Sequence, residues 1–222
     1  MEKIKGLAAE DVWDYENGFL WYSDLARLNK LLAQYELYKH VLDLPGDVVE
    51  LGTFKGASAI KFATFRQLLE TDYSRKIVCF DAFGPFPDRE ISMQSDIDFL
   101  KKFEEAAGTG LSKKQLDWLL REKKIDNFEL VGGNIFDTLP DYLVANPQLK
   151  ISLLHLDMDV MEPTAFALEH LYERVVKGGM IVVDDYPSVG GTVKAVDIFL
   201  EKHELTISKL PYYSVPSFII KK

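Results

Sequence analysis

The segment VVELGTFKGAS, residues 48–58, restricts the fold of this chain more than any other stretch. An apolar run of strand length leads into a turn with Gly52 and Gly56, and apolar residues at helical spacing follow over residues 57–69. This order predicts a buried strand, a tight turn and a helix. Because a buried strand that leads directly into a helix is the repeating unit of a parallel sheet, we expect an α/β fold.

The same alternation of apolar runs and helical segments continues along the chain. Strands are predicted at residues 47–52, 76–83, 128–133, 150–159, 180–186, 205–210 and 217–222. Helices are predicted at residues 19–43, 57–69, 97–107, 113–124, 163–179 and 191–204. The last two strands are joined by a short turn, so they must pair antiparallel, since a parallel pair needs a longer crossover. We therefore expect a doubly wound, mostly parallel, seven-stranded sheet whose last strand pair is antiparallel.

The whole chain, residues 1–222, is predicted to form a single domain. A length of 222 residues with 47% hydrophobic content suffices for one substantial core. Residues 1–44 are expected to form a helical extension, with one or two amphipathic helices over residues 19–43. Residues 85–126 form an insert after the second strand, and we expect this insert to act as a lid over an acceptor molecule.

Charge and cysteine content exclude several classes of protein. The formal net charge of −9 argues against binding to nucleic acid or to an anionic membrane, since both need clustered Lys and Arg. The single cysteine, Cys79, lies in an apolar run and suits a reducing compartment. The N-terminus has no signal-peptide core, and no stretch is apolar enough to span a membrane. We expect a cytoplasmic protein.

Polar residues gather where the predicted strands end. In an open parallel sheet, ligands bind beside the carboxyl ends of the strands. The residues at these ends are Glu50 and Gly52 after the first strand, Asp81 after the second, Gly133 and Asn134 after the third, Asp157 and Asp159 on the fourth, and Asp184 and Asp185 after the fifth. Carboxylates at one sheet edge repel one another, so this pattern indicates a bound cation, a hydroxyl-rich ligand, or both.

The turn after the first strand differs from the turns that bind phosphates. A dinucleotide site of the Rossmann type has the pattern G-x-G-x-x-G, whereas Glu50, Gly52 and Gly56 form E-x-G-x-x-x-G, and Phe54 would crowd a diphosphate. This pattern suits an adenosyl ligand without phosphates, such as S-adenosylmethionine. Alternatively, the glycines serve only close packing within the chain. Asp81 is placed to accept hydrogen bonds from ribose hydroxyls, or it is an exposed residue that opens a loop.

The second group of acidic residues predicts a metal site. Asp157 and Asp159 end one buried strand, and Asp184 and Asp185 end the next. Carboxylate oxygens that converge in this way suit Mg²⁺ or Ca²⁺ rather than zinc, which prefers His and Cys. The Asp184–Asp185 pair could instead cap the following helix. His155 shares the Asp157 side of its strand and is either a hydrogen-bonded core residue or a general base.

Several segments resemble the macrocin O-methyltransferase family, which comprises metal-dependent S-adenosylmethionine enzymes that methylate sugar hydroxyls of natural products. The matching segments are LPGDVVELGTFKGAS, FDAFGPFP, NIFDTLP, LHLDMDVMEPTAFALEHLYERVVKGGMIVVDDY and GTVKAVDIF, which span most of residues 44–200. The two acidic pairs also look like those of the caffeoyl-CoA and catechol O-methyltransferases. The resemblance implies a class I methyltransferase sheet and assembly into a homodimer or a higher homo-oligomer.

The resemblance also implies a role for each matched residue. The implied cofactor contacts are Glu50, Gly52, Thr53 and Ser58 for the methionine part and ribose, Asp81 for the ribose hydroxyls, and Asn134 and Ile135 for the adenine. The implied metal ligands are Asp157, Asp184 and Asp185. Asp157, Asp159 or His155 would accept the proton of the attacking hydroxyl.

Taken together, the residues and the resemblance predict an O-methyltransferase that uses S-adenosylmethionine and Mg²⁺ and acts on a hydroxyl of a sugar or of a sugar-containing small molecule. Two other functions remain open. One is a nucleotide-dependent oxidoreductase, which the absence of the second glycine disfavours. The other is a non-catalytic module that binds S-adenosylmethionine or a sugar.

Overall fold

The computed structural model describes residues 3–87 and 89–222. Residues 1, 2 and 88 belong to the predicted extension and insert and lie outside the described residues. The described chain forms a seven-stranded sheet with the order β3-β2-β1-β4-β5-β7-β6. The strands are β1 (Asp47–Leu51), β2 (Ile77–Asp81), β3 (Phe128–Gly132), β4 (Ile151–Leu156), β5 (Val175–Val183), β6 (Ser208–Leu210) and β7 (Tyr213–Ile220).

Parallel pairing joins the first five strands of the sheet. β1 pairs with β2 and β4, β2 pairs with β3, and β4 pairs with β5, all in parallel. β7 pairs antiparallel with both β5 and β6. The predicted doubly wound, mostly parallel sheet with an antiparallel last pair is confirmed. Strand order runs outward in both directions from the β1–β4 pair, and such a switch point opens a crevice beside the carboxyl ends of the strands.

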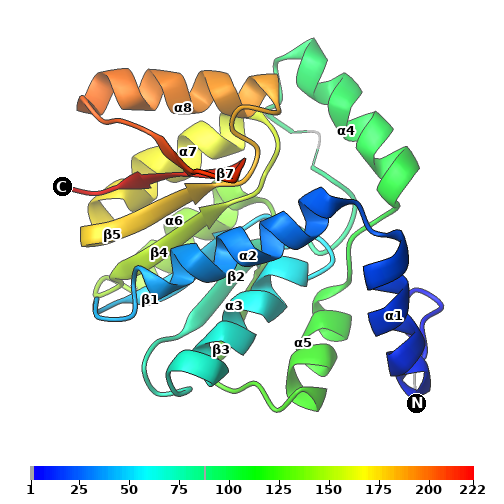
Figure 1. Cartoon of the computed structure of the whole chain (residues 1–222). Helices are drawn as coiled ribbons and strands as arrows, with labels where there is room; N and C mark the ends of the chain where they lie inside the picture. The colour runs from blue at the N-terminus through cyan, green and yellow to red at the C-terminus, as the bar shows by residue number, and fades with distance from the viewer. Residues whose placement is uncertain (1–2, 88) are drawn as a thin grey trace.

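Helices cover both faces of this sheet (Figure 1). They are α1 (Val12–Tyr22), α2 (Leu25–Lys39), α3 (Ala57–Leu69), α4 (Gln94–Ala107), α5 (Lys113–Glu122), α6 (Ile135–Ala145), α7 (Met161–Leu171) and α8 (Gly190–His203). One core lies between the sheet and α2, α3 and α5, and it includes Tyr38, Phe62 and Leu116. A second core lies under α6, α7 and α8, and it includes Leu139 and Leu168. Strands that are buried on both faces account for the continuous apolar runs in the sequence.

Local sequence signals start three of these helices. The Asp24 side chain begins α2 by accepting the backbone N–H two residues later, at 2.7 Å. Ser112 and Gln115 form a capping box at the start of α5. Asn134 begins α6 in the same way as Asp24 begins α2, because its side-chain oxygen accepts the backbone N–H of Phe136 at 3.0 Å. Each cap satisfies an N–H group that has no partner inside the helix and contributes about 1 kcal/mol.

The predicted extension contains α1 and α2, and the predicted insert contains α4 and α5. α2 packs on the sheet, whereas α1 and α4 lie on the side to which the carboxyl ends of the parallel strands point (Figure 1). Within the described chain, α1 buries none of its 11 residues. Its Trp13, Trp21 and Tyr22 are 72%, 68% and 86% exposed, so the helix leaves an aromatic surface uncovered.

The C-terminal end of the helix predicted over residues 163–179 is wrong. α7 stops at Leu171, a short 3-10 helix (Tyr172–Arg174) follows, and β5 begins at Val175. Gly178, near the end of the predicted helix, instead lies inside β5 with a φ of +80°, where the register between β4 and β5 shifts. A glycine at positive φ occurs both at irregularities of strands and at the ends of helices. The sequence pattern therefore does not distinguish a strand irregularity from a helix end at this position.

Helix α6 is missing from the predicted helices. Pro140 lies inside it and removes one backbone donor, so the segment carries a helix-breaking signal although it is helical. No helix within residues 3–87 and 89–222 is both long enough and apolar enough to cross a membrane.

Candidate functional site

A cavity of about 940 Å³ lies at the carboxyl ends of the parallel strands. The turn after β1, the ends of β2, β4 and β5, helix α4 and the start of α6 all contribute to its lining. The predicted site residues that border it are Gly52, Thr53, Ser58, Asp81, Asn134, Ile135, Asp157, Asp159, Asp184 and Asp185. Among the described residues, Glu50, Gly56 and His155 do not border it.

Two glycines shape the turn after β1. Gly52 has a φ of +87°, and a Cβ at this position would lie 1.8 Å from the backbone oxygen of Asp157. Gly56 has a φ of +75°, and its Cβ would lie 2.5 Å from the side chain of Leu116. Positive φ angles and close packing within the chain therefore explain why glycine stands at both positions. This agrees with the alternative interpretation from the sequence, in which the two glycines serve close packing. The contact also brings the turn against the first residue after β4.

Asp81 ties the turn after β1 to the end of β2. One oxygen of its carboxylate accepts the backbone N–H groups of Thr53 and Phe54, each at 2.8 Å, and the other accepts the N–H of Phe83 at 2.6 Å. A carboxylate offers about four acceptor positions, so these three bonds leave about one on the cavity side. Asp81 is therefore a structural anchor of the site that also borders the cavity.

Two hydroxyl side chains lie beside the same turn. Thr53 is 2% exposed, and its Oγ1 has no hydrogen-bond partner among the described residues. Ser58 is nearly buried in the first turn of α3. A buried hydroxyl without a partner requires an explanation, and a polar ligand in the cavity is one.

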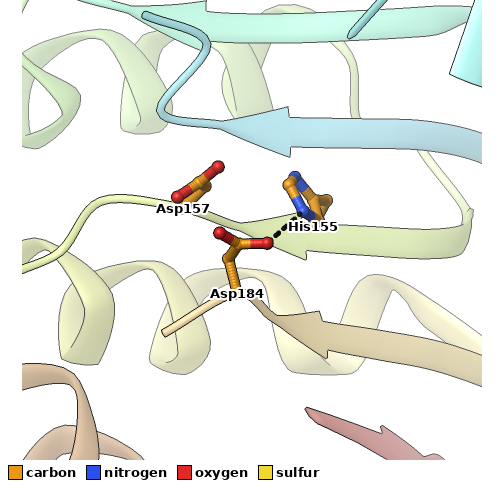
Figure 2. A group of neighbouring side chains, drawn as sticks. All are labelled: His155, Asp157 and Asp184. Atoms are coloured by element: carbon orange, nitrogen blue, oxygen red, sulfur yellow. Dashed lines mark ion pairs between the residues drawn. The ribbon is translucent and has the colours of Figure 1, made fainter. Parts of the chain in front are cut away.

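The residues of the second acidic group come from neighbouring strands, as expected, and their ligand atoms form two overlapping groups. The Asp184 N–H donates to the last carbonyl of β4 at 2.9 Å, which fixes the two strand ends side by side. Ligand atoms of Asp157, Asp159 and Asp185 lie within 4.8 Å of one another, and those of His155, Asp157 and Asp184 form a second such group. Figure 2 shows His155 on β4, Asp157 just beyond the end of that strand, and Asp184 beyond the end of β5.

Crowding of carboxylates disfavours the ionised form of three of these aspartates. Burial, followed by the charge of Asp184, raises the pKa of Asp157 well above its ordinary value. Burial and the charge of Asp157 raise the pKa of Asp159 to about 7. Burial and the charge of Asp159 raise the pKa of Asp185 to about 9. A divalent cation among these oxygens would lower all three pKa values, because an opposite charge favours the ionised form.

The donor set fits a hard divalent cation. Asp185 Oδ2 is buried and has no hydrogen-bond partner among the described residues. Buried oxygens without partners are uncommon and require an explanation such as a bound ion. Oxygen ligands favour Mg²⁺ or Ca²⁺ over zinc. The predicted metal ligands Asp157, Asp184 and Asp185 all border the cavity, but Asp184 and Asp185 belong to different groups of converging ligand atoms, and each group includes Asp157.

His155 lies in the core between two carboxylates. Its ring is fully buried, with Nδ1 3.2 Å from Glu50 Oε1 and Nε2 3.6 Å from Asp184 Oδ1. Burial alone would lower the pKa of His155, but the contacts with Asp184 and Glu50 outweigh burial and raise the pKa to about 10. Of the two interpretations of this residue, the structure supports a core residue, because its ring is fully buried and does not border the cavity.

The placement of Glu50 at the strand tip is wrong. Glu50 lies inside β1, where it pairs in register with His155 of β4, and its side chain is fully buried. Both carboxylate oxygens lack a hydrogen-bond partner among the described residues, so the ion pair with His155 is the contact that compensates this charge. Because side chains alternate along a strand, Glu50 faces the core under α2 and α3 and not the cavity.

Lys30 is a site residue that carries no local sequence signal. It lies on α2 and borders the cavity, and its Nζ donates to Asp184 Oδ2. Burial would lower the pKa of Lys30, but the charges of Asp157 and Asp184 outweigh burial and raise it. In turn, contacts with His155 and Lys30 outweigh the burial of Asp184 and hold its pKa below the ordinary range. The two partners are 154 residues apart, so only the folded chain reveals this pair.

Comparison with protein families gives one match that covers most of the chain. The family model described as Macrocin-O-methyltransferase (TylF) matches residues 24–211. The matched region includes each predicted site residue, and the resemblance inferred from the sequence segments is confirmed.

Two curated relatives of this chain are O-methyltransferases. The chain is 30% identical over 169 residues to 8-demethyl-8-(2,3-dimethoxy-alpha-L-rhamnosyl)-tetracenomycin-C 4'-O-methyltransferase of Streptomyces olivaceus, covering 73% of this chain and 60% of that protein. It is 27% identical over 168 residues to mycinamicin III 3''-O-methyltransferase of Micromonospora griseorubida, covering 73% of this chain and 63% of that protein. The chain thus spans less than two thirds of the length of these relatives.

A solved structure extends the similarity to the fold. The apo structure of the TDP-rhamnose 3'-O-methyltransferase of calicheamicin biosynthesis aligns with a TM-score of 0.68 at 27% identity. The alignment covers 96% of this chain and 86% of that chain.

Proposed function

Since the chain belongs to the macrocin O-methyltransferase family, we propose that it transfers a methyl group from S-adenosylmethionine to a hydroxyl of a sugar or of a sugar-containing small molecule. One observation carries this proposal: a single cavity of about 940 Å³ is bordered both by the turn after β1 with Asp81 and Asn134 and by the aspartates after β4 and β5. A cavity of this size accommodates a cofactor next to an acceptor.

The cofactor would occupy the part of the cavity near β1, β2 and β3. Asp81 keeps about one acceptor position for a ribose hydroxyl, and the unpartnered hydroxyl of Thr53 offers a hydrogen bond to the same ligand. Ser58, Asn134 and Ile135 border this part and would contact the methionine and adenine ends. Glu50 would act on the cofactor only indirectly, because its side chain holds His155.

The acceptor would lie against the aspartates. Asp157, Asp184 and Asp185 would hold Mg²⁺, with Asp159 beside them, and the ion when bound would lower the pKa of a coordinated hydroxyl and orient it. Asp159 and Asp157 border the cavity and are the residues we assign as proton acceptors. His155 would position Asp184 from the core side, because its ring is buried and contacts both Glu50 and Asp184.

Calorimetry with S-adenosylhomocysteine, with and without Mg²⁺, tests the proposal. We expect this product to bind, and Mg²⁺ to bind with a stoichiometry near one per chain. Replacing Asp184 and Asp185 together by Asn keeps the shape of the site and removes two charges, so Mg²⁺ binding should fall severely while S-adenosylhomocysteine binding persists. Binding of NAD in place of S-adenosylhomocysteine would support an oxidoreductase.

An activity assay separates an enzyme from a binding module. With S-adenosylmethionine and a panel of nucleotide-linked and glycosylated acceptors, methyl transfer should stop in excess EDTA and return with Mg²⁺ or Mn²⁺. Full activity in EDTA would rule out the metal-assisted part of the proposal and leave Asp157 or Asp159 as a simple general base. Binding of S-adenosylhomocysteine without transfer to any acceptor would point to a non-catalytic module.

We further propose that the chain assembles into a homodimer or a higher homo-oligomer through α1. The support for this is the aromatic surface of α1, where Trp13, Trp21 and Tyr22 remain exposed while the helix buries no residue within the described chain. Large aromatic side chains dominate the energetics of protein interfaces.

A further inference from the structure

Lys30 places a permanent positive charge inside the carboxylate group. We propose that Lys30 is an internal counter-cation of this site, which holds Asp184 when the divalent ion is absent and competes with that ion for it. The inference rests on the metal site of the proposed function, and it assigns a role to a residue on the N-terminal helix α2.

The geometry places a basic side chain beside each oxygen of Asp184. Lys30 Nζ donates to Oδ2, and His155 Nε2 lies 3.6 Å from Oδ1. The Lys30 side chain is 20% exposed and the Asp184 side chain 2% exposed, so bulk water screens this pair weakly. A divalent ion that takes Asp184 as a ligand must therefore displace Lys30 from Oδ2 or bind beside it.

Charge balance sets the direction of the competition. Asp157, Asp159, Asp184 and Asp185 bring four carboxyl groups to one wall of the cavity, and Lys30 is the lysine paired with them. Its ammonium lowers the negative potential of the wall, and it repels an incoming divalent ion. Loss of this one charge should leave a more negative site that attracts the ion more strongly.

Lys30 also has room to move when an ion enters. It borders the cavity, so a rotation of its flexible side chain would carry the ammonium from Asp184 towards the space where an acceptor would bind. The ammonium would then remain in the site as a hydrogen-bond donor.

A purely structural ion pair would behave differently. If Lys30 only fastened α2 to the sheet, its removal would lower stability and leave the affinity for the ion unchanged. If Lys30 were needed to orient Asp184 as a ligand, its removal would weaken ion binding. The affinity for the ion therefore separates the three roles.

The test is a calorimetric Mn²⁺ titration of the full chain with S-adenosylhomocysteine present. We expect Lys30→Met to bind Mn²⁺ at least about tenfold more tightly than the unchanged protein, a difference of ~1.4 kcal/mol. Lys30→Arg keeps the charge and should stay within about threefold. Lys39→Met is the matched control, because it removes the same charge from the same helix at a surface pair with Glu36.

Each outcome decides the question. Equal or weaker Mn²⁺ binding by Lys30→Met, in a sample with an unchanged circular dichroism spectrum, would overturn the inference while the metal site stands. If Lys30→Met binds Mn²⁺ and the unchanged protein does not, Lys30 excludes the ion completely, and the inference is supported. No Mn²⁺ binding by any variant would overturn the metal site and the inference with it. If Lys30→Met does not fold, Lys30→Gln retains a polar end, and the Mn²⁺-dependent rise of its melting temperature gives the same comparison.

Discussion

The contact between Gly52 and the backbone of Asp157 leaves no room for a methyl group. We expect Gly52→Ala to lower the free energy of unfolding by roughly 2–4 kcal/mol, because Ala would have to adopt a positive φ and the ends of β1 and β4 would have to separate. Urea unfolding followed by circular dichroism measures this change. Gly18→Ala is the matched control, since outside its own helical backbone no atom of the described residues lies within 4 Å of a Cβ placed at Gly18 on α1. The control should be neutral or stabilise by up to about 1 kcal/mol, and equal losses for both variants would contradict the prediction.

His155 compensates the buried charge of Glu50. We expect His155→Leu to lower the free energy of unfolding by roughly 3–5 kcal/mol, because the buried carboxylate of Glu50 would lose its partner. Glu50→Gln added to this variant should recover part of the loss, since it removes the stranded charge. A double-mutant cycle measured by urea unfolding gives the coupling. If the second substitution only adds to the loss, the ion pair is not the source of the effect.

Residue identities in the site are predictable to different degrees. Asp81, Asp157, Asp184 and Asp185 follow strand-length apolar runs, so their place at the edge of the sheet follows from the sequence, and the structure puts them at one cavity. Glu50 precedes its strand end by one residue, and this single step turns the side chain from the cavity to the core. Lys30 contacts a partner 154 residues away, and no local pattern indicates such a pair.

At the scale of elements, Asp96 fastens helix α4 to two others. It is 1% exposed, and its Oδ2 accepts the Met161 N–H at 2.9 Å, at the start of α7. The same oxygen lies so close to the first turn of α8 that a Cβ on Gly191 would meet it at 2.0 Å. A carboxylate at two helix N-termini is stabilised by both helix dipoles.

We expect Asp96→Ala to loosen α4. Amide hydrogen exchange within residues 94–107 should become at least about tenfold faster, which corresponds to ~1.4 kcal/mol of local stability. Asp98→Ala is the control, because Asp98 is bonded only to Gln94 of its own helix among the described residues. Unchanged exchange in Asp96→Ala would show that α4 is held by its apolar contacts alone.

Elements with strong periodicity are predictable, and elements with a mixed signal are not. The seven strands follow from their apolar runs, and α3 and α8 from helical spacing. α6 contains Pro140, and β5 contains Gly178, and each residue carries the signal of a different local structure. Packing of these segments against the sheet overrides the local preference, and packing partners cannot be read from a short stretch of sequence.

At the scale of the whole molecule, the uncovered surface of α1 predicts self-association. Trp13 and Trp21 are each more than two thirds exposed in the single chain, so they are available for contact with a second copy. We expect the double variant Trp13→Glu, Trp21→Glu to be monomeric, because it places two charges in that contact. Light scattering at micromolar concentration measures the mass, and Tyr73→Glu is the control, at a residue 98% exposed outside α1. A monomer in the unchanged protein would refute the interface, and an oligomer in the double variant would place the interface elsewhere.

The lining of the cavity begins at Phe19 and ends at Val215. Tyr213 and Val215 come from β7, which enters the sheet between β5 and β6. Without β7, the edge of β5 would lose its antiparallel partner and the cavity would lose part of its lining. We therefore expect a chain truncated before residue 213 to bind S-adenosylhomocysteine more weakly than the unchanged chain, because Tyr213 and Val215 would no longer border the cavity.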